Sequence, residues 1–208
     1  MENSSSRGRP RGFDKTAAIA AIVETYWARG YAQTTYESLC EASGVGRQSL
    51  VYAFGDKREM FTAALRAYEA KIVSGVCAAL NASHDGRSGV EAAFGLWQEA
   101  AAAGKGCLMV STAADAGASD PEIAELVQRA RDRLVASFSQ AFDRAKRSGQ
   151  VRQGLNEEAL GALAVACGDG CLVHARKPGG AQFAKRALTA FLSAVFIETD
   201  RQTLGERP

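Results

Sequence analysis

Apolar residues recur at spacings of three and four along almost the whole chain, whereas runs that alternate between apolar and polar residues are missing. Spacings of three and four place side chains on one face of an α-helix, and alternation is typical of a half-buried strand. The clearest helix is expected over 121–148, where one apolar seam contains Ile123, Val127, Ala130, Leu134, Phe138, Ala141 and Ala145. The pattern predicts an all-α fold.

Helix-capping residues divide the first part of the chain. Asp14 is a suitable N-cap for a first helix that ends at Gly30. Thr34 and Glu37 have the spacing of a capping box, which predicts a second, short helix ending at Ser43–Gly44. The apolar face of the first helix is predicted to contain Ile19, Ile22, Val23, Tyr26 and Trp27.

Two further helices follow the second. A short helix is predicted over 47–54, and Asp56 and Glu59 then have capping-box spacing at the start of a long fourth helix. The apolar stripe of that long helix contains Phe61, Leu65, Tyr68, Ile72, Val76 and Leu80. After a loop at 83–89, the remaining helices are expected over 90–103, 107–114, 121–148, 157–176 and 182–198.

The second and third predicted helices, with Gly44 in the turn between them, have the arrangement of a helix-turn-helix. In that motif the second helix lies in the major groove of DNA. At about 100° of rotation per residue, Leu50 and Phe54 face inward while Gln48 and Tyr52 face outward. The residues expected to contact bases or phosphates are Thr34, Thr35, Arg47, Gln48, Ser49, Tyr52 and Lys57. A solvated polar helix is the alternative.

The distribution of charge is more informative than its total, because the formal net charge of the 208-residue chain is only +2. Arg7, Arg9 and Arg11 lie in a segment rich in glycine, serine and proline, with no acidic residue between Glu2 and Asp14. We expect residues 1–12 to form a flexible basic arm whose arginines lie in an A/T-rich minor groove. A disordered basic tail without such a role is the alternative.

These segments together resemble the DNA-binding domain of the TetR family of bacterial repressors. The residues that carry the resemblance are Gly30-Tyr31, Thr34-Thr35, Leu39, Ala42-Ser43-Gly44-Val45, Leu50, Phe54 and Lys57. The start at 8–14 and the segment Phe54-Gly55-Asp56-Lys57 resemble one subgroup of that family. The chain departs from the family pattern at Gly46, where Ser or Asn is common, and at Val51, where a tyrosine is common.

The resemblance implies a regulator with a DNA-binding domain at 13–58, a ligand-sensing and dimerisation domain at 59–200 and a tail at 201–208. It implies double-stranded operator DNA as a partner, release by a small-molecule inducer of unknown identity, and a homodimer formed by the last two helices. The small residues of the helix at 157–176 suit close packing against another helix in such a dimer: Gly161, Ala162, Ala164, Ala166, Gly168 and Gly170.

The inducer pocket implied by the resemblance is expected among apolar and aromatic residues: Tyr68, Phe94, Trp97, Cys107, Met109, Phe138 and Phe142. An aromatic stripe at helical spacing also suits an ordinary core, and both interpretations stay open. Cys107 follows Lys105 at a predicted helix N-terminus, and both features lower a thiol pKa. We therefore consider Cys107 a candidate thiol sensor, with plain packing as the alternative.

Cys167, Cys171 and His174 share one helix face at spacings of four and three residues, which suits copper(I) or zinc. Three ligands on one helix rarely complete a metal site, so a copper- or zinc-responsive regulator is kept as an alternative, and no cofactor or metal is expected. The sequence has only two histidines, and it contains neither a phosphate-binding loop nor a nucleophile elbow. These features argue against an enzyme. A helical interaction adaptor is the third class.

The chain has no stretch apolar enough to span a membrane, and the start of the sequence lacks the apolar block of a secretory signal. Its five cysteines are an odd number in scattered positions, as expected in a reducing compartment. These features predict a cytoplasmic protein.

Overall fold

The computed structural model describes residues 12–115 and 120–197, and it confirms the all-α prediction. In these residues the chain forms ten α-helices and one π-helical turn, η1. The helices are α1 (Lys15–Gln33), α2 (Tyr36–Ser43), α3 (Arg47–Phe54), α4 (Lys57–Tyr68), η1 (Glu69–Val73), α5 (Ser74–Ala82), α6 (Gly86–Ala102), α7 (Leu108–Ala114), α8 (Pro121–Arg147), α9 (Glu157–His174) and α10 (Gly180–Val195). No described helix is long and apolar enough to cross a membrane.

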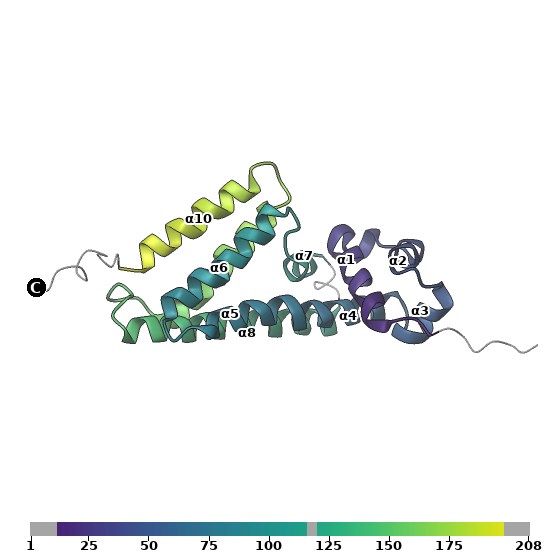
Figure 1. Ribbon diagram of the computed structural model, residues 1–208, viewed down its shortest axis with the longest axis horizontal. Helices are drawn as coiled ribbons and strands as arrows, with labels where there is room; N and C mark the ends of the chain where they lie inside the picture. The colour runs from purple at the N-terminus through teal and green to yellow at the C-terminus, as the bar shows by residue number, and fades with distance from the viewer. Residues whose placement is uncertain (1–11, 116–119, 198–208) are drawn as a thin grey trace, which may run out of the picture.

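The molecule is elongated, with a head at one end and a body at the other (Figure 1). We call α1 to α3 and the first part of α4 the head, and α5 to α10 the body. The helix α4 leaves the head and continues through η1 into α5, which runs beside α8 (Figure 1). This rod is the predicted long fourth helix, with a π-helical turn in its middle.

Side-chain caps define the helix starts that the sequence indicated. The Asp14 carboxylate accepts from the N–H groups of Thr16 and Ala17, at 2.8 and 3.2 Å. Asp56 and Glu59 form the predicted reciprocal box at the start of α4. Gly30 has a φ of +74° and interrupts α1 at the residue where the helix was expected to end. Such a φ is accessible mainly to glycine, so the chain can turn there toward α2.

The predicted capping box of the second helix was wrong by one residue. Thr35 is the N-cap of α2, and its box partner is Ser38 and not Glu37. Thr34 is only 1% exposed, and its hydroxyl donates to the carbonyl of Gly30 at 2.7 Å. Thr34 is thus the C-cap of α1, and the start of α2 falls to Thr35.

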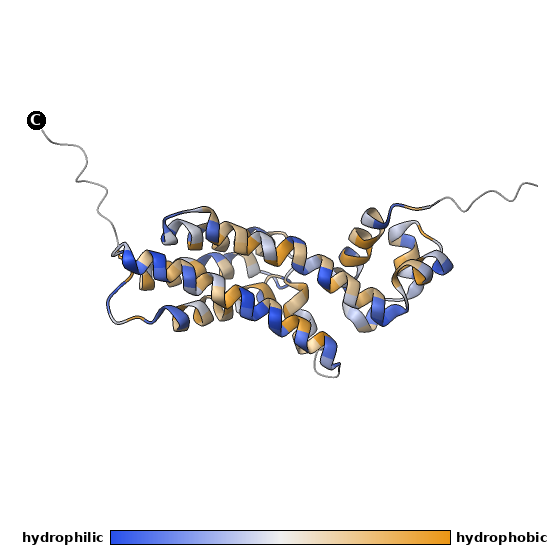
Figure 2. Cartoon of the chain, turned by 90° about the horizontal axis from the view of Figure 1, so that it is seen from below, coloured by the Kyte–Doolittle hydropathy of each residue, from blue (hydrophilic) through white to orange (hydrophobic). Residues whose placement is uncertain are grey.

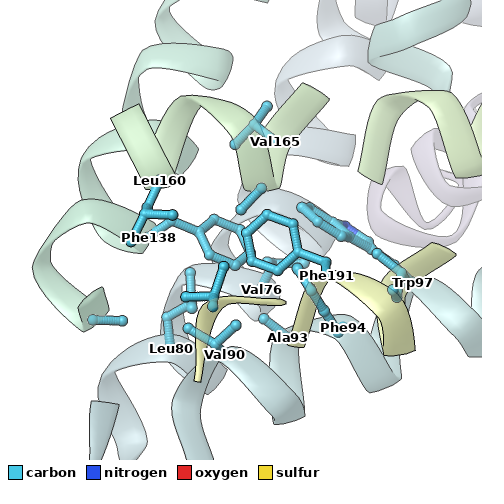
Figure 3. Close-up of a cluster of buried hydrophobic side chains, with 14 of the residues drawn as sticks. Val76, Leu80, Val90, Ala93, Phe94, Trp97, Phe138, Leu160, Val165 and Phe191 are labelled. Atoms are coloured by element: carbon cyan, nitrogen blue, oxygen red, sulfur yellow. The ribbon is translucent and has the colours of Figure 1, made fainter. Parts of the chain in front are cut away.

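Two apolar cores lie along the molecule, and hydrophobic residues turn inward in both the head and the body (Figure 2). The first core is in the body and is built largely of aromatic rings, including Phe94, Phe138 and Phe191 (Figure 3). The second unites the head with α7 and the first half of α8, because Ile22 and Phe61 share it with Leu108 and Ile123. The head is therefore packed onto the body.

Part of the small-residue stripe of α9 belongs to the core of this single chain. An added Cβ at Gly161 would meet Ser139 of α8, and one at Gly168 would lie 2.2 Å from the Trp97 ring. Ala164 is fully buried in the same core. The expectation that Gly161, Ala164 and Gly168 serve a dimer contact was therefore wrong, since the inward side of α9 packs on α6 and α8.

The contact between Gly168 and Trp97 makes a stability prediction. Gly168→Ala should lower the free energy of unfolding by about 1–3 kcal/mol, because the new methyl group forces the indole out of place. Gly95→Ala in α6 is the matched control, since an added Cβ there meets nothing within 4 Å. That change should raise the stability by about 0.5–1 kcal/mol through lower chain entropy. Urea unfolding at one fixed protein concentration measures both, and equal effects would contradict the packing described.

Candidate DNA-binding surface and sensor cavity

The helix-turn-helix has the geometry that the sequence predicted for it. The helix α2 ends at Gly44, which has a φ of +67° and whose N–H donates to the carbonyl of Cys40 at 2.9 Å. The helix α3 covers Arg47–Phe54, the predicted range, and Leu50 is fully buried on its inner side. The turn and the buried leucine fix the angle between the two helices.

The outer face of α3 is free. Tyr52 is 94% exposed, and Gln48 and Ser49 are also exposed. Their side chains need no conformational change in the protein to reach a partner that approaches this face. A short helix with exposed polar residues beside its N-terminus can enter a major groove.

Two basic residues of this surface lie over aromatic rings. The guanidinium carbon of Arg47 is 4.1 Å from the centroid of the Tyr36 ring, and Lys57 Nζ is 4.6 Å from that of Tyr31. Such cation–π contacts restrict the charged groups and lower the entropy that binding would cost. The Tyr36 hydroxyl also accepts from the Lys57 N–H at 3.0 Å, which joins α2 to the start of α4. The sequence shows only the helix spacing of these two tyrosines, so their contacts with Arg47 and Lys57 could not be predicted from it.

The other residues predicted to contact DNA differ in their exposure to solvent. Thr35 is exposed, although its hydroxyl oxygen already caps α2. Thr34 was predicted as a phosphate contact, and that prediction was wrong because its buried hydroxyl is used inside the head. Arg7, Arg9 and Arg11 lie outside the described residues.

A cavity of about 220 Å³ lies at the junction between head and body, and we call it the junction cavity. Its wall takes residues from the head helix α1, from the rod and from three helices of the body. The wall includes Trp27, Tyr68, Trp97, Cys107, Leu134 and Leu172. Three of the residues predicted for the inducer pocket line this cavity, namely Tyr68, Trp97 and Cys107.

The other four residues predicted for the pocket do not line the junction cavity. Met109 lines a smaller neighbouring cavity of about 30 Å³ that shares Cys107 and Leu134 with the junction cavity. Phe94, Phe138 and Phe142 are at most 1% exposed and pack ring against ring in the body core (Figure 3). Their assignment to the pocket was wrong, because Phe94 and Phe142 pack against Phe191 of α10, and Phe138 packs against both of them.

Polar groups in the junction cavity are few. The Tyr68 hydroxyl donates to Cys107 Sγ at 3.5 Å. Asp169 of α9 lines the cavity, and one of its oxygens is 3.5 Å from Arg131. Burial raises the pKa of the Asp169 carboxyl, and the positive charge of Arg131 opposes that rise. The cavity lining is thus mostly apolar, and Tyr68, Lys71 and Asp169 are among its few polar residues.

Cys107 lacks the activated thiol that was expected of it. Burial raises its pKa, although the hydrogen bond from Tyr68 acts in the opposite direction. Lys105 does not lower this pKa, because its ammonium group pairs with Glu24 at 2.9 Å and lies over the Trp27 ring. At neutral pH the desolvated thiol stays protonated, and protonated thiols react slowly with oxidants and electrophiles.

Of the three possible metal ligands, only Cys167 and Cys171 lie in contact with each other. Burial raises the pKa of Cys167, and burial with the neighbouring Cys167 raises the pKa of Cys171 to about 12. His174 lies against the Phe183 ring, with 4.6 Å between ring centroids. Within 12–115 and 120–197, no group of three or more His, Cys, Asp or Glu side chains has an arrangement that could hold a metal ion. The Cys167, Cys171 and His174 site is therefore not formed.

Three sets of polar contacts fix the head on the body. Arg58 of α4 binds both oxygens of Asp120, at 2.5 and 2.9 Å, and also reaches Glu122 at the start of α8. On the opposite side, Arg176 donates to the backbone carbonyls of Lys105 and Trp27. Lys105 pairs with Glu24 of α1, as described above. Residues so distant in sequence gave no signal in the helix pattern that could have predicted these pairs.

The raised pKa of Cys107 predicts how alkylation depends on pH. A raised pKa leaves less thiolate at a given pH, so iodoacetamide should modify Cys107 more slowly in the folded protein than in the urea-unfolded chain at pH 7.5. The rate in the folded protein should still be rising above pH 9, beyond the ordinary thiol pKa of about 8.5. Peptide mass spectrometry gives both rates. Faster reaction in the folded protein would show an activated thiolate and revive the sensor hypothesis.

Comparisons with known proteins agree with this architecture. Residues 18–64 match the family model described as "Bacterial regulatory proteins, tetR family", and residues 86–191 match "Tetracyclin repressor-like, C-terminal domain". The chain is 28% identical over 151 residues to the uncharacterized HTH-type transcriptional regulator YezE of Bacillus subtilis, covering 69% of this chain and 76% of that protein. It is 38% identical over 63 residues to the HTH-type transcriptional repressor ComR of Escherichia coli, covering 30% of each protein.

A solved structure shares the whole arrangement. It is a cysteine variant of the TetR-family regulator CifR in complex with a 26-bp double-stranded operator DNA, and it has a TM-score of 0.71 and 26% identity. The match covers 88% of this chain and 99% of that one. With both family models matched in order along the chain, the protein belongs to the TetR family and is a DNA-binding transcriptional regulator.

Proposed function

We propose that the protein is a homodimeric repressor that binds double-stranded operator DNA through α3 and releases it when a small molecule occupies the junction cavity. The observation that carries this proposal is the cavity's wall, because it joins Trp27 of the head to Tyr68 of the rod and Trp97 of the body. A ligand in that space would press on the element that presents α3. The proposal therefore connects a binding event with the position of the DNA-binding surface.

On DNA, Gln48 is proposed to contact a base edge, since its side chain is exposed beside the N-terminus of α3. Arg47, Ser49, Tyr52, Thr35 and Lys57 are proposed to contact phosphates or neighbouring bases. The arginines at positions 7, 9 and 11 keep their proposed place in an adjacent minor groove. The subgroup suggested by the segments at 8–14 and 54–57 also remains part of this proposal.

The proposed dimer uses the outward sides of α9 and α10. Large apolar side chains are exposed there, with Leu163 54% and Phe183 46% accessible, and Ala162, Ala166 and Val173 also lie on the open side of α9. Exposed apolar patches of this kind mark interaction surfaces in soluble proteins. A second copy related by a two-fold axis would cover this face and would place two heads on two half-sites.

The release signal is proposed to be a molecule that binds reversibly. The thiol of Cys107 is buried and its pKa is raised, so occupation of the cavity is better supported than oxidation of the thiol. DNA as the target places the protein in the cytoplasm in this proposal. An electrophoretic mobility shift on the DNA upstream of its own gene tests the function, and an absence of any shift at low salt would contradict it.

Replacing the proposed base contact predicts a specific loss of DNA binding. Gln48→Ala should weaken operator binding by about 1–3 kcal/mol per half-site, because one bidentate contact is lost. The fold should be intact, since Gln48 is exposed and does not belong to the head core. Gln140→Ala, an exposed glutamine on α8, is the matched control and should bind DNA as the unaltered protein does. Equal affinities for both variants would remove Gln48 from the recognition surface.

Placing a charge on the proposed interface predicts dissociation. Leu163→Glu should raise the dimer dissociation constant by about tenfold or more, because a carboxylate would have to lose its water in an apolar contact. Ala92→Glu, on an exposed position of α6, is the control and should leave the dimer intact. Sedimentation velocity at several concentrations measures both. A monomeric native protein, or a Leu163→Glu variant that dimerises normally, would contradict this interface.

A further inference from the structure

The carboxylate of Asp169 has one weak partner, although it lines a mostly apolar cavity. Its Oδ2 is 3.5 Å from a guanidinium nitrogen of Arg131, longer than the distance of about 2.7–2.9 Å that a strong charge-assisted hydrogen bond has. Within the described residues, no second hydrogen bond or ion pair involves this carboxylate. A carboxylate away from bulk water costs free energy unless it is well paired. Asp169 can therefore gain from a further partner.

This carboxylate can be reached from the junction cavity. Asp169 lines that cavity and the smaller cavity beside it, and its side chain is 27% exposed. Among the described side-chain nitrogen and oxygen atoms that are both shielded and unpaired, none is an Asp169 oxygen, so its second oxygen, Oδ1, is open to the surrounding space. Burial is the main cause of the raised pKa of Cys107, and the negative charge of Asp169 adds to it. The carboxylate is therefore near the thiol at the cavity wall.

The charges around this carboxylate favour a cation as the further partner. Asp169 is the only acidic residue among the described residues that line the junction cavity. Lys71 also lines it, but Lys71 is exposed, so its ammonium group lies in water where its repulsion is screened. Arg131 is 40% exposed and compensates the charge of Asp169 only through its one long contact. Burial raises the pKa of both Tyr68 and Cys107, which keeps these two groups neutral at pH 7.

The rest of the wall and the size of the cavity suit an aromatic ring. Trp27, Tyr68 and Trp97 line the cavity, and aromatic rings both pack against apolar groups and attract cations. A cavity of about 150 Å³ holds benzene in another protein. The junction cavity, at about 220 Å³, therefore has space for one ring with a substituent of roughly three further heavy atoms.

We propose that Asp169 is a specificity-determining ligand contact and that the junction cavity binds a small aromatic amine in its protonated form, with the ammonium group against the Asp169 carboxylate. The inference rests on the proposed function only in calling that molecule an inducer. The aromatic part of the ligand would lie toward Trp27 of the head and Trp97 of the body, which border the same space.

The test uses two probes of nearly the same shape, 2-phenylethylamine and 2-phenylethanol. The amine carries an ammonium group at pH 7, as a lysine side chain does, and the alcohol is neutral. Phenylacetate, an anion of similar size, is the third probe. The chain has two tryptophans, Trp27 and Trp97, and both line the cavity. Nitrogen-15-labelled full-length protein should give one indole N–H signal from each, and the signals that move during a titration give the dissociation constants.

The amine should bind the unaltered protein about tenfold more tightly than the alcohol, because hydrogen bonds to charged groups are the stronger ones. Phenylacetate should bind most weakly. In Asp169→Asn, which keeps the shape of the side chain, the preference for the amine should be lost, since the ammonium group would leave water without a counter-charge. Asp132→Asn removes an exposed carboxylate from α8 and is the matched control, in which the preference should persist.

Four results would overturn the inference. Equal or tighter binding of the alcohol to the unaltered protein would do so even if Asp169→Asn did not fold. A preference for the amine that survives in Asp169→Asn would show that another group reads the charge. Tightest binding of phenylacetate would show that the cavity selects an anion, and no movement of either indole signal at millimolar probe would show that it takes none of these molecules. These titrations contain no DNA, so the mobility shift described above can succeed or fail independently.

Discussion

The rod formed by α4, η1 and α5 must bury side chains in two cores at once. Phe61, Leu65 and Tyr68 lie in the core shared by the head with α7 and α8, and Val76 and Leu80 lie in the aromatic core of the body. A straight α-helix has one fixed rotation per residue, so two cores separated by a few turns need not fall on the same face. The π-helical turn Glu69–Val73 changes the register between them. The orientation of the head relative to the body thus depends on this turn together with the contacts at the junction.

The apolar contacts and the ion pairs at the junction have different roles. Exposed salt bridges contribute about 0–1 kcal/mol each, which is little beside the burial of Leu108 and Ile123 of the body in the core that they share with the head. Apolar burial therefore holds the head on the body. The fork between Arg58 and Asp120, which keeps the pKa of that carboxyl below its usual value, and the bonds from Arg176 fix its direction. A ligand that displaces Trp27 or Tyr68 would disturb the apolar contacts at the junction. The polar contacts would limit the directions in which the head can then move.

Local rules predicted the parts of the fold that depend on local interactions. The bounds of α3, the cap at Asp14, the box at Asp56 and the start of α8 after Asp120 follow from neighbouring residues, and the structure confirms them. The box at Thr34 failed because the carbonyl of Gly30 competes for the same hydroxyl. Periodicity places a side chain on an inner face, but it does not tell whether that face meets a core or a cavity. For that reason Phe94 and Phe138 were assigned with Tyr68 and Trp97, although only the latter two line the cavity.

The thiol prediction failed for a related reason. Helix position and a nearby lysine are visible in the sequence, whereas desolvation and the competing pair between Lys105 and Glu24 are not. The sequence thus predicted the helix-turn-helix and part of the cavity wall, but not the contacts that join head and body.

The central claim is that the contents of the junction cavity set the positions of the two heads in the dimer. The most direct measurement is the distance between spin labels on a non-natural residue placed at the exposed Glu41 position of each protomer, by pulsed electron paramagnetic resonance. Without ligand, the distances should include those that allow the two α3 helices to meet half-sites about 34 Å apart. With the cavity occupied by a small aromatic probe such as 2-phenylethylamine, the distribution should move away from that separation. Identical distributions, under conditions where nitrogen-15 signals of the Trp27 and Trp97 indoles show the cavity to be filled, would contradict the account.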